Sequence, residues 1–139
     1  MEARAKEFRY AIALGADGAV STENGATLVP GADWTPEHLL LAALVRCTLK
    51  SLRHHLDRAG VALGGAIGGA SARVTKRESD GRFAAVETTV ELSVQLDPEP
   101  DDDKVAALLA KAERDCFVGA SLTAAPAYGW VVNGRRRGD

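Results

Sequence analysis

Apolar residues alternate with polar or small residues near the start of the chain. Every second position from residue 8 to residue 14 carries a large apolar side chain, namely Phe8, Tyr10, Ile12 and Leu14. This spacing is typical of a strand with one buried face, so we predict a strand over residues 4–14. Two shorter strands follow over residues 19–22 and 26–29, joined by a tight turn at Glu23-Asn24-Gly25. The first part of the chain therefore predicts a three-stranded meander.

The pattern becomes helical after Trp34. Thr35 can cap a helix, Pro36 suits the first helical position, and Trp34 can pack against Leu39. We predict that this helix runs to about Arg58, just before a glycine that can end it. Its first half is apolar nearly all the way round, which places it at the centre of the fold, whereas its second half is charged and must reach solvent or a cleft.

A glycine-rich segment follows, over residues 63–69. No Gly-Lys-Ser/Thr sequence accompanies it, so we interpret it as a flexible connection and not as a phosphate-binding loop. Beyond it we predict strands over 71–77 and 82–96, with a turn at 79–81 between them. In the second of these strands alternate residues are predicted to face the core: Ala84, Val86, Thr88, Val90, Leu92, Val94 and Leu96.

The last third of the chain predicts a second helix and a final strand. Apolar residues recur at helical spacing over 102–115, after an acidic stretch that favours a helix start. A short helical turn over 117–122, a strand over 128–133 and a flexible, solvated tail at 134–139 complete the chain. The element order βββαββαβ predicts an α+β fold in one domain, 1–139, with an antiparallel sheet covering two helices.

Charge and composition narrow the possible partners. The chain has 139 residues, 46% of them hydrophobic, with 17 Lys plus Arg against 19 Asp plus Glu. It lacks the basic surplus that nucleic-acid binding requires, so we expect no nucleic-acid partner. No apolar run is long enough to span a bilayer, and residues 1–7 are too charged for a secretory signal. We therefore expect a cytoplasmic protein with no membrane partner.

The candidate chemistry lies in two cysteines. Cys47 falls in the middle of the first helix, and Cys116 ends the apolar stripe of the second. Buried thiols are commonly inert core residues. A reactive thiol with a resolving partner would have the same layout, because the faces that carry these cysteines are expected to meet. Histidines 38, 54 and 55 are too sparse for a metal site, since adjacent histidines point about 100° apart on a helix.

Three segments resemble one known family. They are Gly18-Ala-Val-Ser-Thr-Glu-Asn-Gly25, Thr35-Pro-Glu-His-Leu-Leu-Leu-Ala-Ala-Leu-Val-Arg-Cys47, and Ala112-Glu-Arg-Asp-Cys116-Phe-Val-Gly-Ala-Ser-Leu122. In combination they resemble the osmotically inducible protein C and organic hydroperoxide resistance (OsmC/Ohr) proteins, as an OsmC-like member. The resemblance implies an intertwined homodimer, whose sheets wrap central helices and whose active sites lie at the subunit interface.

The resemblance also implies a chemistry and the residues that perform it. Cys47 is similar to the family's peroxidatic thiol, Cys116 to its resolving thiol, and Glu37 to its acidic active-site residue. The implied activity is reduction of organic hydroperoxides, with a dithiol such as dihydrolipoamide as reductant and no metal, haem or flavin. The family pattern includes an arginine in the loop between the first two strands, but residues 14–19 contain none. Thr48 also replaces an aromatic residue common in the peroxidase branch.

Helix geometry sets a condition on Glu37. Ten residues of helix separate it from Cys47 by about 15 Å, with directions that differ by roughly 80°. Glu37 could therefore act only on the thiol of a second chain. The leading hypothesis is a thiol-dependent peroxidase that reduces organic hydroperoxides. The alternative is a non-catalytic OsmC-like protein that holds an apolar ligand at the dimer interface.

Overall fold

A computed structural model describes residues 5–138, and the chain divides into two compact units at residue 36. The N-terminal unit is an antiparallel meander of β1 (Ile12–Leu14), β2 (Val20–Thr22) and β3 (Thr27–Leu28). It confirms the predicted meander, with a shorter first strand: residues 5–11 form none, and residue 4 lies outside the described residues. The expectation that one face of the first strand is buried is wrong, because Ile12 and Leu14 are 69% and 72% exposed.

The second unit begins with helix α1 (Pro36–Ala59), which matches the predicted helix. Gly60 ends it with a φ of 73°, a left-handed conformation that suits glycine. The Val61 N–H donates to the Leu56 carbonyl at 2.9 Å, and the Gly60 N–H donates to the Asp57 carbonyl at 3.2 Å. These two bonds form a Schellman motif, which satisfies carbonyls that the helix end would otherwise leave open.

A four-stranded sheet forms the other layer of this unit, in the order β4-β5-β6-β7. Strands β4 (Ala62–Lys76) and β5 (Phe83–Asp97) make a long antiparallel hairpin with two irregularities in its register. The expectation of a flexible connection over 63–69 is wrong, because this segment pairs with β5. Glycine is needed there for close packing of the backbones: a side chain at Gly68 would overlap the Glu91 carbonyl of β5.

The sheet is mixed and not purely antiparallel as predicted. Strand β6 (Ala127–Val132) pairs with β5 in parallel, with Val90 opposite Tyr128. Parallel pairing requires a long crossover. Helices α2 (Asp102–Arg114) and α3 (Phe117–Ala120) supply it. The predicted helical turn after residue 116 is thus confirmed as α3.

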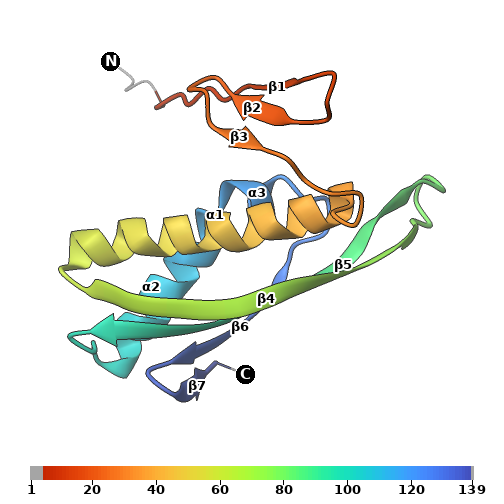
Figure 1. Cartoon of the computed structure of the whole chain (residues 1–139). Helices are drawn as coiled ribbons and strands as arrows, with labels where there is room; N and C mark the ends of the chain where they lie inside the picture. The colour runs from red at the N-terminus through yellow and green to blue at the C-terminus, as the bar shows by residue number, and fades with distance from the viewer. Residues whose placement is uncertain (1–4, 139) are drawn as a thin grey trace. The chain divides into compact units, whose positions relative to one another are not determined.

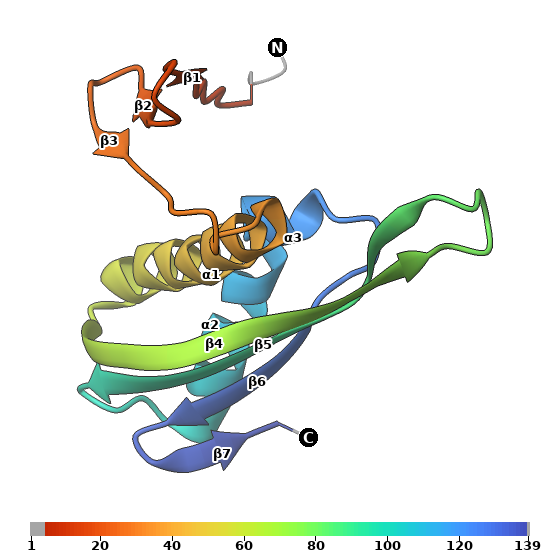
Figure 2. The ribbon, with the colours of Figure 1, turned by 45° about the vertical axis from the view of Figure 1, so that its right-hand side comes forward.

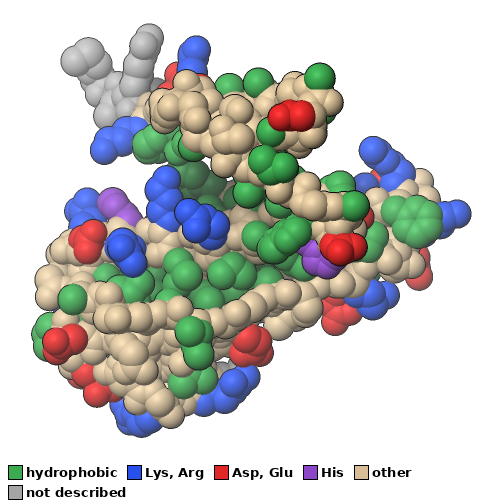
Figure 3. All heavy atoms as spheres, viewed as in Figure 1, with side chains coloured by type: hydrophobic (Ala, Val, Ile, Leu, Met, Phe, Trp, Pro, Cys, Tyr) green, Lys and Arg blue, Asp and Glu red, His purple; other side chains and the backbone are tan. Residues whose placement is uncertain are grey.

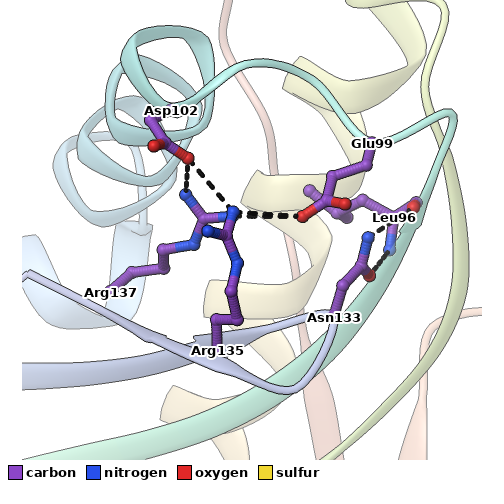
Figure 4. A network of polar contacts seen from close by, with 6 residues as sticks. All are labelled: Leu96, Glu99, Asp102, Asn133, Arg135 and Arg137. Atoms are coloured by element: carbon purple, nitrogen blue, oxygen red, sulfur yellow. Dashed lines mark hydrogen bonds and ion pairs between the residues drawn. The ribbon is translucent and has the colours of Figure 1, made fainter.

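The predicted solvated tail is wrong for residues 135–137, which form strand β7 (Arg135–Arg137) against β6. Asn133 has a φ of 50° in the turn between them, and its side chain donates to and accepts from the Leu96 backbone at 3.1 and 2.8 Å. Arg135 and Arg137 both pair with Glu99 and Asp102, as Figure 4 shows. These ion pairs join β7 to the start of α2.

Both long helices lie on the same face of the sheet (Figures 1 and 2). Alternate residues of β5 point into the layer between the sheet and the helices, and Thr88, Val90, Leu92, Val94 and Leu96 are buried as predicted. Ala84 and Val86, predicted to face the core with them, are only half-buried, because the register of the hairpin shifts near Arg73 and Val74. Helix α2 begins at the N-cap Asp101, whose carboxylate accepts the Lys104 N–H at 2.9 Å. The core holds these strand residues together with Leu44, Leu52, Leu56, Val105, Leu108, Leu109, Ala112, Cys116, Trp130 and Val132.

The tip of the β4–β5 hairpin is one of the charged regions on the surface of the second unit. Figure 3 shows acidic and basic side chains together at the tip of the β4–β5 hairpin. There Arg77 pairs with Asp80 at 2.6 Å. Within the described residues, no helix is long and apolar enough to cross a membrane.

Candidate active site at two cysteines

Cys47 lies on α1 with its side chain half-buried against the α2–α3 junction. Its Sγ accepts a hydrogen bond from the Val118 backbone N–H at 3.5 Å. The Phe117 N–H also interacts with this sulfur. Cys47 is placed on this side by the helical stripe that buries Leu44 and Ser51, one turn before and one turn after it.

Cys116 lies at the junction of α2 and α3 and is fully buried. It is the N-cap residue of α3, and its Sγ accepts the Gly119 N–H at 3.4 Å. The two thiols are close enough to influence each other, since Cys116 raises the pKa of Cys47. The structure therefore brings the two thiols together, which confirms that the predicted helix faces meet.

A hydrogen bond between His55 and Asp115 holds the α2–α3 junction against α1. His55 Nε2 lies 2.8 Å from Asp115 Oδ2, and Arg114 Nε donates to the other oxygen, Oδ1, at 3.0 Å. Arg114 and His55 lower the pKa of the Asp115 carboxyl to about 2, Arg114 having the larger effect. Asp115 precedes Cys116 directly, so this contact fixes the position of the second thiol.

Two hydroxyl groups surround Cys116. Thr48 Oγ1 lies 3.5 Å from Cys116 Sγ and donates to the Leu44 carbonyl at 2.8 Å. The Tyr128 hydroxyl and the Cys116 sulfur lie beside each other at Gly119, where an added Cβ would come within 2.9 Å of the oxygen and 3.5 Å of the sulfur. Thr48 and Cys116 both influence the pKa of Tyr128. Tyr128 is a neighbour of the thiols that the sequence-based predictions do not include. The alternation of Tyr128, Trp130 and Val132 was the available signal, because it places all three on the side of β6 that faces the helices.

The surroundings of Cys47 disfavour its charged form. Burial raises the pKa of the Cys47 thiol, and the hydrogen bond and charge of Cys116 raise it further. The N–H groups of Val118 and Phe117 act in the opposite direction. Among the described residues, no cation contributes to this balance. The missing loop arginine is therefore not replaced within this unit.

Glu37 lies apart from the thiols, in the exposed first turn of α1. It lines a cavity of about 20 Å³ whose other walls are Leu40, Leu41, Leu44, Ala72, Val74, Ala85, Thr88 and Leu122. Ten residues of helix, about 15 Å, separate it from Cys47 of the same chain.

The described residues contain no group of three or more His, Cys, Asp or Glu side chains that could hold a metal ion.

The fold and the site define a class: α+β proteins in which a half-buried and a buried cysteine lie where a long helix packs against a helical crossover. The sequence profile of the OsmC-like protein family matches residues 29–129, which include both cysteines and Glu37. The chain therefore belongs to the OsmC-like family. Among proteins with curated descriptions, none matches it.

Solved structures show the same fold. An OsmC-like protein of unknown function from Vibrio cholerae superposes with a TM-score of 0.70 at 12% identity, over 81% of this chain and 82% of that one. The OsmC-like protein of Mycoplasma pneumoniae gives 0.60 at 14% identity, over 91% and 98%. The organic hydroperoxide resistance protein OhrB of Bacillus subtilis gives 0.53 at 20% identity, over 90% and 96%.

Proposed function

We propose that this protein is a thiol-dependent peroxidase that reduces organic hydroperoxides. The observation that carries the proposal is that the half-buried Cys47 thiol and the buried Cys116 thiol lie at the same α1–α3 contact, where Cys47 Sγ accepts from Val118 and Cys116 Sγ lies 3.5 Å from Thr48 Oγ1. A thiol that is oxidised by peroxide needs a neighbouring thiol to prevent further, irreversible oxidation. The likeness to an organic hydroperoxide resistance protein gives independent support at the level of the fold.

In the proposed reaction the two sulfurs act in turn. The Cys47 thiolate attacks the terminal oxygen of the hydroperoxide, the O–O bond breaks, and the alkoxide leaves and takes a proton to become an alcohol. Cys47 is then a sulfenic acid. Cys116 attacks its sulfur, water leaves, and a disulfide forms. An external dithiol, such as a dihydrolipoamide-like molecule, reduces the disulfide by thiol–disulfide exchange.

Glu37 enters this proposal through a second copy of the chain. It cannot reach its own Cys47, so we place it in the site formed with the partner's thiol. Exposed apolar side chains support a homodimer, because Ile12, Leu14, Leu28 and Val29 are each more than half exposed in the N-terminal unit. Figure 3 shows hydrophobic side chains at the surface of that unit. A partner subunit would cover them and exclude water from the thiols.

Peroxide consumption tests the activity. Wild-type protein with a dithiol reductant should consume cumene hydroperoxide, and Cys47→Ser should not. Cys116→Ser should complete about one turnover and then accumulate over-oxidised Cys47. Ser121→Ala is the matched control, since it removes only an exposed hydroxyl that bonds to the Phe117 carbonyl. A wild-type rate equal to that of Cys47→Ser would refute the proposal.

The raised pKa of Cys47 supports a second candidate function. A thiol that stays protonated at neutral pH reacts slowly with peroxide. The fold would then serve a non-catalytic protein that holds an apolar ligand at the dimer interface. Tight binding of an alkyl ligand that is unaffected by Cys47→Ser, together with no peroxide turnover, would favour this alternative.

A further inference from the structure

We propose that the hydroxyl groups of Thr48 and Tyr128 assist the second thiol, Cys116, when it attacks oxidised Cys47. The proposal rests on the peroxidase function above and adds two residues to it. Their task is to donate hydrogen bonds to the Cys116 sulfur as negative charge develops on it. Hydrogen bonds to a charged group are stronger than those to a neutral one, so these donors favour the attacking form of the thiol.

The direction of the Thr48 hydroxyl hydrogen determines which hydrogen bonds this side chain makes in the reduced protein. A threonine hydroxyl has one hydrogen, and Thr48 directs it to the Leu44 carbonyl at 2.8 Å. In the resting protein the hydroxyl can therefore only accept from the Cys116 S–H, 3.5 Å away. Rotation about the Thr48 Cβ–Oγ1 bond would turn its hydrogen toward the sulfur. The Leu44 carbonyl would keep the helical hydrogen bond from the Thr48 backbone N–H.

Tyr128 is held in place by its neighbours. Its ring stacks on Trp130 with centroids 6.4 Å apart, and Trp130 Nε1 donates to Glu113 at 2.9 Å. Its hydroxyl lies against Gly119, where an added Cβ would come within 2.9 Å of the oxygen. Burial raises the pKa of Tyr128 to about 12. The phenol therefore remains a hydrogen-bond donor at any pH at which the protein works.

The assisted step balances as follows. The Cys116 sulfur gives an electron pair to the Cys47 sulfur, the S–S bond forms, and the S–O bond of the sulfenic acid breaks. The oxygen leaves with the bonding pair and takes the proton that Cys116 loses, which gives water. Thr48 and Tyr128 exchange no proton with solvent in this step. They stabilise the charge on the attacking sulfur.

The experiment separates this step from the preceding one. Reduced protein is mixed with one equivalent of cumene hydroperoxide or, in parallel, with diamide. Diamide adds to the Cys47 thiol through its N=N bond, and attack by Cys116 then expels the hydrazine and forms the same disulfide. Acid quench, alkylation and mass spectrometry give the rate of the first, bimolecular step and of the second, unimolecular step. Cys116→Ser identifies the intermediate on Cys47.

The variants are Thr48→Val, Thr48→Ser and Tyr128→Phe, with Thr88→Val as the control. Thr88 is a buried threonine of β5 on the wall of the small cavity, whose lining contains no cysteine. Thr48→Val should slow the second step about tenfold, as expected for loss of one hydrogen bond to a charged atom. Tyr128→Phe should slow it about threefold or more. Thr48→Ser and Thr88→Val should keep nearly the wild-type rate, and no variant should change the first step.

Each arm of the experiment has a definite meaning. Slow resolution of the diamide adduct in Thr48→Val, with no reaction toward peroxide in any protein, would support the role of Thr48 while refuting the peroxidase function. Wild-type resolution rates in both Thr48→Val and Tyr128→Phe would overturn the inference. Equal slowing in Thr48→Ser or Thr88→Val would also overturn it, because a packing defect and not the hydroxyl would then be the cause.

Discussion

At the scale of single residues, the reactivity of Cys47 depends on a balance between burial and two backbone N–H groups. Burial has the larger effect and raises the pKa of the thiol. The thiolate is the nucleophile, so the protonated form must first lose its proton. Because the pKa is raised, the reactivity of Cys47 should increase with pH through the neutral range.

We predict that the rate of alkylation of Cys47 rises about tenfold per pH unit through neutrality, because the thiolate fraction rises by that factor below the pKa. The ordinary pKa of a cysteine thiol is 9.0, and burial raises that of Cys47 above this value. The rate should therefore not level off below pH 9. Iodoacetamide labelling followed by mass spectrometry, with Cys47→Ser as the blank, measures it. A plateau near pH 6 would contradict the prediction and show that a cation reaches the sulfur in the assembled protein.

The sequence predicts that the helix faces carrying Cys47 and Cys116 meet, but it does not predict which polar side chains lie beside the thiols. Cys47 and Cys116 fall on apolar stripes of two helices, and such stripes face one another in a two-layer fold. Tyr128 reaches Cys116 because β6 pairs with β5 in parallel, with Tyr128 opposite Val90. Strand register across a long crossover does not follow from local pattern, so the alternation in β6 indicates that Tyr128 faces the helices but not that it lies beside Cys116.

At the scale of elements, the α2–α3 junction is attached to α1 through Asp115. The pKa of this carboxyl is lowered from 3.8 to about 2, mainly by Arg114 and also by His55. Because this pKa is lower in the folded than in the unfolded state, the ionised carboxylate stabilises the folded state. The stabilisation is therefore present above pH 4 and is lost as the pH falls through about 2.

We predict that Asp115→Asn lowers the free energy of unfolding at pH 7 and that the difference from wild type disappears between pH 4 and pH 2. Urea unfolding at several pH values measures this. Arg114→Gln should move the loss to higher pH, since Arg114 is the larger cause of the shift. A difference that stays constant down to pH 2 would show that the ion pair contributes nothing.

The turn between β6 and β7 supports a second prediction at this scale. Asn133 adopts a positive φ and makes two side-chain hydrogen bonds to Leu96. Asn133→Ala should lower the free energy of unfolding by about 2 kcal/mol, through the lost bonds and the strained backbone. Asn133→Gly tolerates the backbone and should cost less. Equal stability of wild type and Asn133→Ala in urea unfolding would contradict this.

The same turn carries two conflicting signals. Asn133-Gly134 is a strong hairpin signal, whereas the three arginines that follow it favour a solvated tail. The ion pairs with Glu99 and Asp102 offset the charge of Arg135 and Arg137. The glycines at 64–69 led to the wrong prediction of a flexible connection. Glycine weakens a strand locally, but here it allows the backbone to approach β5 closely.

At the scale of the whole molecule, the fold class was predictable while the pairing of its last strands was not. The alternation in β5 and the apolar first half of α1 predicted one sheet face packed on helices. The parallel β5–β6 pair depends on the position at which the chain re-enters the sheet after the α2–α3 crossover. Family membership follows from residues 29–129, and the assembly of two chains remains a prediction.

We predict an obligate homodimer in which Glu37 of one chain serves Cys47 of the other. Heterodimers of Glu37→Ala and Cys47→Ser, prepared by co-refolding, should regain up to about half the activity per dimer, because one of their two sites keeps both residues. Sedimentation at micromolar concentration measures the assembly. A monomer, or mixed subunits no more active than either parent, would contradict shared sites.

The two edges of the sheet differ in their capacity to recruit another strand. Strand β7 is short and carries three arginines, a composition that discourages uncontrolled growth of a sheet. Strand β4 has 15 residues, and its first eleven, Ala62 to Ala72, contain no charge. Any extension of the sheet, whether ordered assembly or amyloid-like aggregation of a destabilised variant, should therefore start at β4 and proceed in one direction only.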